Sequence, residues 1–213
     1  MRVALFGGTG FVGSYLVDAM IAAGMQPVLL VRSGHAGKVR HPAECVTIEG
    51  DIADMGAVNS LLSQADVAIY NIGILRESPG RGVTFDELHN KAARRVMDAA
   101  AQLGVKRFLL MSANGARADG TGYQKTKYLA EQYLETSDLA WTIFRPSVLF
   151  GDPRGNLEFA TQLADNAIDL FMDDGGQLFM REAGQDDLLY RPTDENDNAR
   201  PSPGSYLIAS LFK

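Results

Sequence analysis

Hydrophobic positions in the first 150 residues follow two alternating patterns. Short, continuously apolar runs are typical of strands that are buried on both faces of a sheet. These runs lie at residues 3–6, 28–31, 46–48, 67–72, 108–111 and 141–144. Between them, apolar residues recur at steps of three and four, which predicts helices at residues 11–23, 58–62, 85–103 and 123–134. The alternation predicts an α/β fold in which a doubly wound parallel sheet carries helices on both faces.

The pattern changes after residue 150. Apolar residues at helical spacing predict one more amphipathic helix over 157–171, with Asn156 as its N-cap. Apolar segments flank the sequence DDGG at 173–176, which predicts a hairpin. Residues 191–204 are polar and contain three prolines, so we interpret them as loop or disorder.

Charge divides the chain at the same place. Residues 1–150 carry 15 basic and 14 acidic side chains, whereas residues 151–213 carry 5 and 12. We therefore predict one domain over 1–150, whose motifs, given below, indicate nucleotide binding, and a short acidic C-terminal segment over 151–213. An acidic chain without a basic stripe argues against nucleic-acid binding.

Composition narrows the class further. Apolar residues make up 46% of the 213 residues, which is ordinary for a globular protein with a real core. No run of about 20 apolar residues is present, so we expect no membrane span, and the glycines near the N-terminus argue against a signal peptide. The single Cys45 excludes an internal disulfide and a Cys-based zinc site. We expect no metal site and a cytoplasmic location.

A glycine-rich loop joins the first predicted strand to the first predicted helix. Such a loop turns the chain sharply, lets the backbone approach a pyrophosphate, and lets helix and strand pack closely. The helix N-terminus then presents N–H groups and a positive dipole end to the phosphates. The alternative is a glycine-rich turn without a ligand. The residues expected at the pyrophosphate are Gly7, Thr9, Gly10, Phe11, Val12 and Gly13.

The residues after the second predicted strand bear on the choice of dinucleotide. An NAD site usually has an acidic residue there, but this chain has Arg32 and Ser33, and no acid occurs between Asp18 and Glu44. A guanidinium binds a 2′-phosphate bidentately. We therefore favour NADP(H) over NAD(H), the alternative being a solvated basic loop.

Two further segments would border the cofactor. Asp51 follows the third predicted strand and could accept a hydrogen bond from the adenine amino group, with Ile52 against the ring. The equal alternative is that Asp51 only caps the next helix. Asn71 and Gly73 end the fourth predicted strand, where the backbone would approach the cofactor.

Tyr123 and Lys127 stand four residues apart on a predicted helix and so share a face. A free tyrosine has a pKa near 10, and a nearby ammonium lowers that pKa by stabilising the phenolate. The phenol then exchanges a proton with a carbonyl or hydroxyl oxygen while hydride moves to or from nicotinamide. Lys127 would also hold the nicotinamide ribose. The alternative is a pair of solvated side chains on a surface helix.

Together these residues resemble the short-chain dehydrogenase/reductase superfamily, of the extended or atypical, epimerase/dehydratase-like kind. The motifs that carry the resemblance are GGTGFVG, GDI, NIGIL, GVKRFLLMSANGA, YQKTK and RPSVLFG, within residues 1–153. The nearest subgroup is that of the 39-kDa accessory subunit of respiratory complex I. This resemblance implies a Rossmann fold that binds NADP(H) or NAD(H), with the glycines at the pyrophosphate and Tyr123 and Lys127 at the nicotinamide end. It also implies that Pro146 borders the cofactor, and that His89 stands where many relatives have a helix Asn, as a packing or a functional residue.

The chain departs from the family pattern in two places. Asn114 holds the place of the serine or threonine that hydrogen-bonds the substrate oxygen in active relatives, and Ser112 lies nearer the strand. Asn114 could still donate that hydrogen bond, so both are candidate catalytic residues. After RPSVLFG, the usual substrate region is absent. The acidic segment is a reduced lid, a surface for a protein partner, or a truncated or altered tail.

Two functions follow from these observations. The first is an NADP(H)-dependent oxidoreductase that acts on a small carbonyl or alcohol, or on a quinone, with epimerase or dehydratase chemistry as a variant. The second is a non-catalytic NADP(H)-binding module of a larger assembly, such as a complex I-type accessory subunit peripheral to a membrane complex. The small-molecule substrate is not identified by the sequence.

Overall fold

A computed structural model describes residues 1–146, residue 149 and three later strands at 168–172, 178–182 and 188–190. These residues belong to two separate units, a large one within residues 1–150 and a small one within 151–202. Each unit is described by itself. No helix in these described ranges is long and apolar enough to cross a bilayer.

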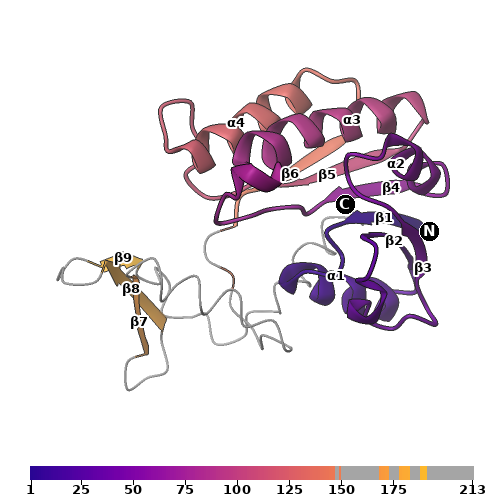
Figure 1. Cartoon of the computed structure of the whole chain (residues 1–213), viewed down its shortest axis with the longest axis horizontal. Helices are drawn as coiled ribbons and strands as arrows, with labels where there is room; N and C mark the ends of the chain where they lie inside the picture. The colour runs from indigo at the N-terminus through magenta and orange to yellow at the C-terminus, as the bar shows by residue number, and fades with distance from the viewer. Residues whose placement is uncertain (147–148, 150–167, 173–177, 183–187, 191–213) are drawn as a thin grey trace. The chain divides into compact units, whose positions relative to one another are not determined.

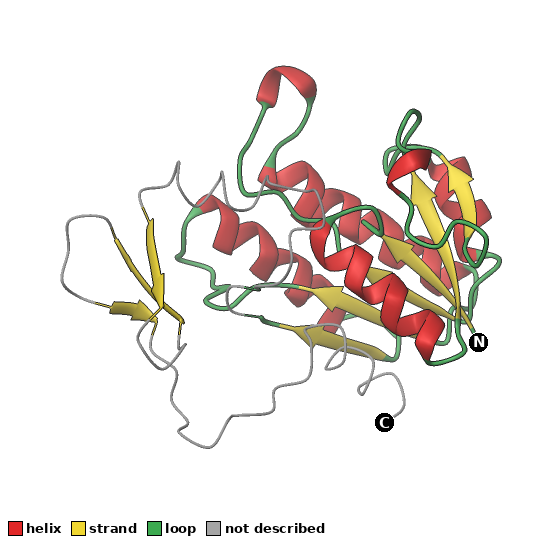
Figure 2. Cartoon of the chain, turned by 90° about the horizontal axis from the view of Figure 1, so that it is seen from below, coloured by secondary structure: helices red, strands yellow, loops and turns green. Residues whose placement is uncertain are grey.

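The large unit contains a six-stranded sheet whose strands all run parallel (Figure 1). The strands are β1 (Arg2–Phe6), β2 (Gln26–Val31), β3 (Val46–Glu49), β4 (Val67–Tyr70), β5 (Arg107–Met111) and β6 (Trp141–Phe144). Their order is β3-β2-β1-β4-β5-β6, and successive strands are rotated relative to one another, as a twisted sheet requires (Figure 2). The predicted doubly wound fold is confirmed. The order reverses direction between β1 and β4, which creates a crevice at the carboxyl ends of the strands where ligands bind in such folds.

Helices cover both faces of this sheet (Figure 1). α1 (Phe11–Ala22) packs on one face through Leu16, Val17 and Met20. The opposite face carries α2 (Met55–Leu62), α3 (Ala92–Gln102) and α4 (Gly122–Glu135). Two separate buried clusters result, one on each face of the strands. Short 3-10 turns at η1 (Ala36–Lys38) and η2 (Pro79–Arg81) lie in the connecting loops.

The helix that was predicted over 85–103 has two different geometries. Its first part, η3 (Asp86–Lys91), is a π-helix, and α3 follows it directly. In a π-helix the hydrogen bonds run from i to i+5, so the turn is wider than in an α-helix. The consecutive polar residues His89 and Asn90 are both buried here, at 1% and 7% exposure. An apolar pattern at steps of three and four does not reveal such a wider turn.

The small unit is an antiparallel sheet of three strands, β7 (Ile168–Met172), β8 (Leu178–Glu182) and β9 (Leu188–Tyr190). The pairing of β7 with β8 confirms the predicted hairpin. The predicted helix over 157–171 is wrong for its last residues, which belong to β7. Apolar residues at 168, 170 and 172 satisfy a period of two as well as a helical spacing, and strand pairing decides between them. Residues 156–167 and 191–204 lie outside the described residues.

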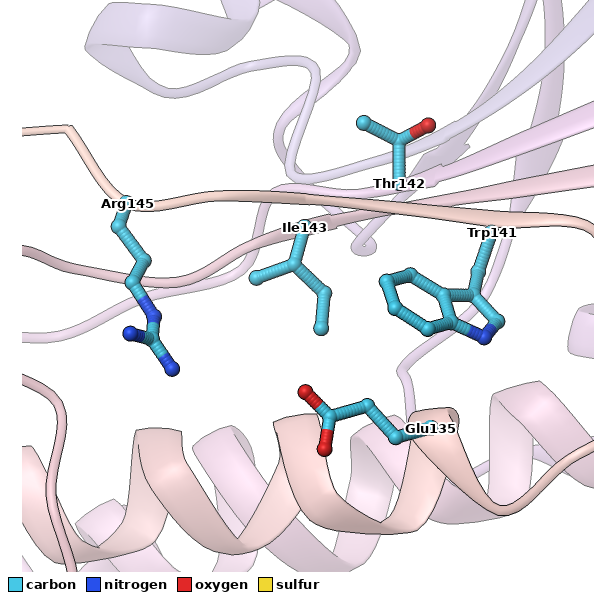
Figure 3. A pocket seen from close by; sticks show the side chains of 5 residues that line it. All are labelled: Glu135, Trp141, Thr142, Ile143 and Arg145. Atoms are coloured by element: carbon cyan, nitrogen blue, oxygen red, sulfur yellow. The ribbon is translucent and has the colours of Figure 1, made fainter.

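A partly buried ion pair joins the segment just after β6 to α4. The Glu131 carboxylate is fully buried and accepts hydrogen bonds from Arg145 Nε at 2.9 Å and Nη2 at 2.5 Å. Figure 3 shows Trp141, Ile143 and Arg145 pointing from this strand toward α4, with Thr142 on the opposite side. These four residues and Glu135 line a cavity of about 510 Å³. The cavity contains none of the predicted site residues, so it does not define the coenzyme site.

We predict that Arg145→Met lowers the free energy of unfolding by about 3 kcal/mol, because the fully buried Glu131 carboxylate loses its partner. Urea unfolding measures this. The double variant Glu131→Leu with Arg145→Met should be more stable than Arg145→Met alone. Lys106→Met is the matched control, because its solvent-exposed pair with Asp66 contributes little to stability. Equal losses in Arg145→Met and Lys106→Met would contradict a stabilising clamp between β6 and α4.

Candidate coenzyme site

Two positions in the glycine-rich loop have no room for a side chain. Gly7 has a φ of +88°, and a Cβ there would lie 3.0 Å from the Asn71 carbonyl oxygen at the end of β4. A Cβ at Gly13 would overlap the Gly7 carbonyl oxygen and the backbone of Gly8. The Gly10 N–H donates to the Gly7 carbonyl at 3.2 Å, which closes the turn. The loop is therefore held against β4 by backbone contacts, as a close-approach phosphate loop requires.

The start of α1 has the electrostatics of an anion site. Gly10 is its N-cap, in extended conformation, and no side chain caps the helix. The first turn, which begins at Phe11 and Val12, contains no acidic residue. The positive end of the helix dipole is therefore not neutralised by the helix's own first turn. Together with the cradle formed by Gly7 and Gly13, this arrangement fits a pyrophosphate.

The basic loop after β2 separates into paired and unpaired residues. Arg40 Nε and His41 Nε2 contact the Asp18 carboxylate on α1, at 3.4 Å and 3.1 Å. Arg32 and Ser33 directly follow β2 and are exposed. Arg32 has no ion pair or side-chain hydrogen bond within the described part of the chain. Its guanidinium is therefore available to a phosphate.

The proposed capping role of Asp51 is wrong. The N-cap of α2 is Asp54, whose carboxylate accepts the N–H groups of Gly56 and Ala57 at 2.9 Å and 3.2 Å. The exposed Asp51 carboxylate instead accepts the Ala53 N–H at 3.0 Å, in the turn after β3. Ile52 beside it is buried. The contact of Asp51 with adenine stays a prediction.

The Lys127 ammonium group is buried where β4 and β5 end. Its Nζ donates to the Met111 carbonyl at 2.8 Å and to the Ile72 carbonyl at 3.4 Å. A Cβ built on Gly73 would lie 3.6 Å from the same Nζ. Burial lowers the pKa of Lys127 to about 8, and the Glu131 carboxylate partly opposes this. Lys127 therefore holds both strand ends against α4.

Tyr123 lies one turn before Lys127 and packs among aromatic rings. Its ring centroid is 5.6 Å from Phe85 and 5.1 Å from His89, edge to face in both cases. Burial raises the pKa of the Tyr123 phenol above its ordinary value of 10.0. The expected lowering of this pKa by Lys127 is therefore wrong for this arrangement. The ammonium is hydrogen-bonded to carbonyls, and no hydrogen bond joins it to the phenol among the residues described.

His89 is the residue whose importance the sequence reasoning underestimated. It is 1% exposed, and its two ring nitrogens contact Ile74 N and Thr126 Oγ1. Burial, and next the charge of Lys127, lower the pKa of His89 to about 3. Its packing role was weighed from the sequence, but its position between two predicted site segments was not. A signal that could have found it is the polar pair His89 and Asn90 between the apolar positions Leu88 and Ala92.

The two candidates for the substrate oxygen differ in exposure. Ser112 is 3% exposed, and its Oγ has no hydrogen-bond partner among the described residues. Asn114 is exposed, and its backbone N–H donates to the Pro146 carbonyl at 2.8 Å. The Asn114 side chain therefore stays available to a ligand, while Pro146 fixes its backbone. The structure brings the ends of β5 and β6 together here.

The parallel sheet, its reversal between β1 and β4, and the tight glycine loop define a Rossmann fold, and the family model and curated relatives place the protein in the short-chain dehydrogenase/reductase superfamily. A family model described as NAD(P)H-binding matches residues 7–169. Because this match spans most of the chain, the protein belongs to the NAD(P)H-binding family.

Curated relatives and solved structures agree with this family. A ceramide reductase of Caulobacter vibrioides is 30% identical over 150 residues, covering 70% of this chain and 46% of the relative. The 40 kDa subunit of NADH-ubiquinone oxidoreductase of Neurospora crassa is 29% identical, covering 69% and 40%. The chain thus spans less than half the length of these relatives.

The fold also matches Bordetella bronchiseptica WbmH in complex with NAD⁺, with a TM-score of 0.63, 20% identity and coverage of 77% and 62%. ChuY, an anaerobilin reductase from Escherichia coli O157:H7, matches with a TM-score of 0.58, 22% identity and coverage of 82% and 81%. At these identities the likeness concerns the fold alone.

We predict that stability gains from Lys127 as the pH rises. Its pKa is about 8 when folded and ordinarily 10.5, so between these values the unfolded chain binds more protons. The free energy of unfolding should then rise by up to about 1.4 kcal/mol per pH unit. Urea unfolding of the wild type and Lys127→Met, at about pH 7 and about pH 9.5, measures the difference in slope. Lys106→Met, which removes an exposed ammonium, should keep the wild-type slope. A shared slope in all three proteins would refute the buried ammonium.

Proposed function

We propose that this protein is an NADP(H)-dependent oxidoreductase that acts on a small carbonyl or alcohol, or on a quinone. The observation that supports it most is the position of Tyr123 and Lys127. Lys127 donates hydrogen bonds to backbone carbonyls at the ends of β4 and β5. These strand ends lie at the same edge of the sheet as the glycine-rich loop, where the crevice is found. A nicotinamide coenzyme would supply or accept the hydride. The cradle at Gly7 and Gly13, which a Cβ would fill, fits its pyrophosphate.

In this proposal the phenol of Tyr123 acts as a proton donor. A tyrosine at its ordinary pKa is protonated at neutral pH, and burial raises the pKa of Tyr123 further. A protonated phenol suits the reduction of a carbonyl, in which the oxygen must gain a proton as hydride arrives at carbon. The exposed amide of Asn114 donates a hydrogen bond to the same oxygen. Lys127 holds the strand ends beside α4 through its hydrogen bonds to the Ile72 and Met111 carbonyls.

The basic loop supports NADP(H) rather than NAD(H). Arg32 follows β2, where the adenine ribose lies in such folds, and it lacks a partner among the residues described. Arg40 and His41 are held by Asp18. Arg32 is thus the guanidinium that would bind a 2′-phosphate, and Ser33 would add a hydroxyl donor.

A second candidate function is a non-catalytic coenzyme-binding module of a larger assembly. Three observations favour it: Lys127 is hydrogen-bonded to carbonyls, burial raises the pKa of Tyr123, and Asn114 replaces a serine. A relative named as a subunit of NADH-ubiquinone oxidoreductase supports this alternative. In it, the acidic segment over 151–213 contacts a protein partner. We propose a cytoplasmic location for this protein, or, if it is a module of a membrane complex, a location peripheral to that complex.

For the oxidoreductase, we predict that Tyr123→Phe lowers kcat for NADPH oxidation at least about 100-fold, because proton transfer is lost. NADPH affinity should stay within about twofold, since the phenol is no part of the phosphate cradle. Absorbance of NADPH with a panel of quinones, aldehydes and ketones measures the first, and calorimetry the second. Tyr128→Phe on the same helix is the matched control and should keep full activity.

Two results would separate the candidates. Unchanged turnover in Tyr123→Phe would remove its role as proton donor. Tight NADPH binding without oxidation by any acceptor in the panel would favour the module over the oxidoreductase.

We predict that Arg32→Ala weakens NADPH binding about 10- to 100-fold, because a charge-assisted hydrogen bond to the 2′-phosphate is lost. NADH binding should change less than about twofold, since NADH lacks that phosphate. Calorimetric titration with both coenzymes measures this. Arg40→Ala, whose guanidinium already contacts Asp18, controls for the loss of loop charge. Equal losses for the two coenzymes would refute the assignment of Arg32.

A further inference from the structure

The His89 imidazole connects two segments that are far apart in sequence. Its Nε2 is 3.0 Å from the backbone nitrogen of Ile74, in the loop after β4. Its Nδ1 is 3.3 Å from Thr126 Oγ1, on α4 next to Lys127. The ring itself comes from the π-helix η3 and is almost fully buried. One side chain thus contacts the loop beside the predicted nicotinamide end and the helix that carries Tyr123.

These contacts allow a single tautomer. The Ile74 backbone N–H can only donate, so Nε2 must accept and carry no proton. Nδ1 then carries the proton and donates to Thr126 Oγ1. The Thr126 hydroxyl donates its own hydrogen bond to the carbonyl of Gly122 at 2.9 Å or of Tyr123 at 3.1 Å. The chain of hydrogen bonds is complete only with a neutral imidazole.

Packing transmits the position of this ring to Tyr123. The imidazole stacks on Phe85 with centroids 5.4 Å apart, and its plane meets the Tyr123 ring edge to face at 5.1 Å. The nearby ammonium of Lys127 and burial both disfavour a second positive charge here. A displaced or protonated ring would release the Ile74 N–H and change the contact with Tyr123.

We propose that His89 is a positioning residue that ties the loop after β4 to the Tyr123 face of α4 and so sets the width of the nicotinamide end. The consequence for turnover rests on the proposed oxidoreductase function. The contacts of His89 with Ile74 and Thr126 belong to the folded chain itself, so they can be measured without an activity assay.

The test compares His89→Phe with a matched control on β4, whose side chain bonds to the same helical segment. His89→Phe keeps an aromatic ring between Phe85 and Tyr123 but removes both hydrogen bonds. Tyr70→Phe removes a buried hydrogen bond of 2.7 Å to the Leu88 carbonyl in η3 and leaves the His89 link intact. In His89→Phe, the Ile74 amide should exchange with solvent about tenfold faster or more, and NADPH should bind several-fold more weakly. Tyr70→Phe should change neither.

A second measurement uses the wild-type protein, so it decides even where His89→Phe does not fold. Nitrogen-15 NMR of the imidazole at neutral pH should show a protonated Nδ1, an unprotonated Nε2 and a coupling from Nε2 to the Ile74 amide. An Nε2–H tautomer or an imidazolium would overturn the proposal. So would equal effects of His89→Phe and Tyr70→Phe on Ile74 exchange.

Turnover separates this proposal from the proposed function. Where NADPH oxidation is found, His89→Phe should lower kcat by more than it raises the acceptor KM, because Tyr123 is misplaced rather than removed. Where no variant oxidises NADPH but His89→Phe alone weakens coenzyme binding and exposes Ile74, the oxidoreductase function fails and the positioning role stands. If the His89→Phe protein has wild-type kcat and wild-type exchange of the Ile74 amide, the positioning role is overturned and the oxidoreductase function stands.

Discussion

The buried ammonium of Lys127 is the interaction on which the functional end of this fold depends. It reaches from α4 to the backbone carbonyls of Met111 and Ile72, where two adjacent parallel strands end. A charge buried at this depth is tolerated only when its donors are satisfied. The two carbonyl oxygens accept hydrogen bonds from the ammonium, and α4 is thereby held next to the crevice. The positions of Tyr123 and the loop after β4 both follow from this contact.

A second charged pair, Glu131 with Arg145, lies next to Lys127 on α4 and influences it. Glu131 stands one turn beyond Lys127 and is fully buried, but it is neutralised by Arg145 from the end of β6. Its residual negative charge partly restores the pKa of Lys127. On the other side of Lys127, His89 stays neutral, so no second cation competes with the ammonium. Residues from α4, from the end of β6 and from η3 thus set the environment of one buried positive charge.

The sequence predicted the part of this arrangement that depends on periodicity and on local motifs. Continuous apolar runs were sufficient to predict the parallel sheet. The glycine spacing was sufficient to predict the tight loop, in which Gly7 and Gly13 leave no room for a Cβ. The π-helical turn at η3 was not predictable, because His89 and Asn90 are buried by tertiary contacts that a helical pattern does not encode. The pKa of Tyr123 was predicted in the wrong direction for a related reason. Spacing places Lys127 on the same face, but it does not reveal that backbone carbonyls bind the ammonium.

We propose that Tyr123 is a protonated phenol at the nicotinamide end of the coenzyme site. Carbon-13 NMR of the Tyr123 Cζ atom, followed against pH with and without NADP⁺, tests it most directly. We expect a pKa above the ordinary tyrosine value in the free protein, and a shift of this resonance when NADP⁺ binds, because the nicotinamide ring is positively charged. A resonance that titrates near neutral pH, or one that NADP⁺ leaves unchanged while it binds, would contradict this role of Tyr123.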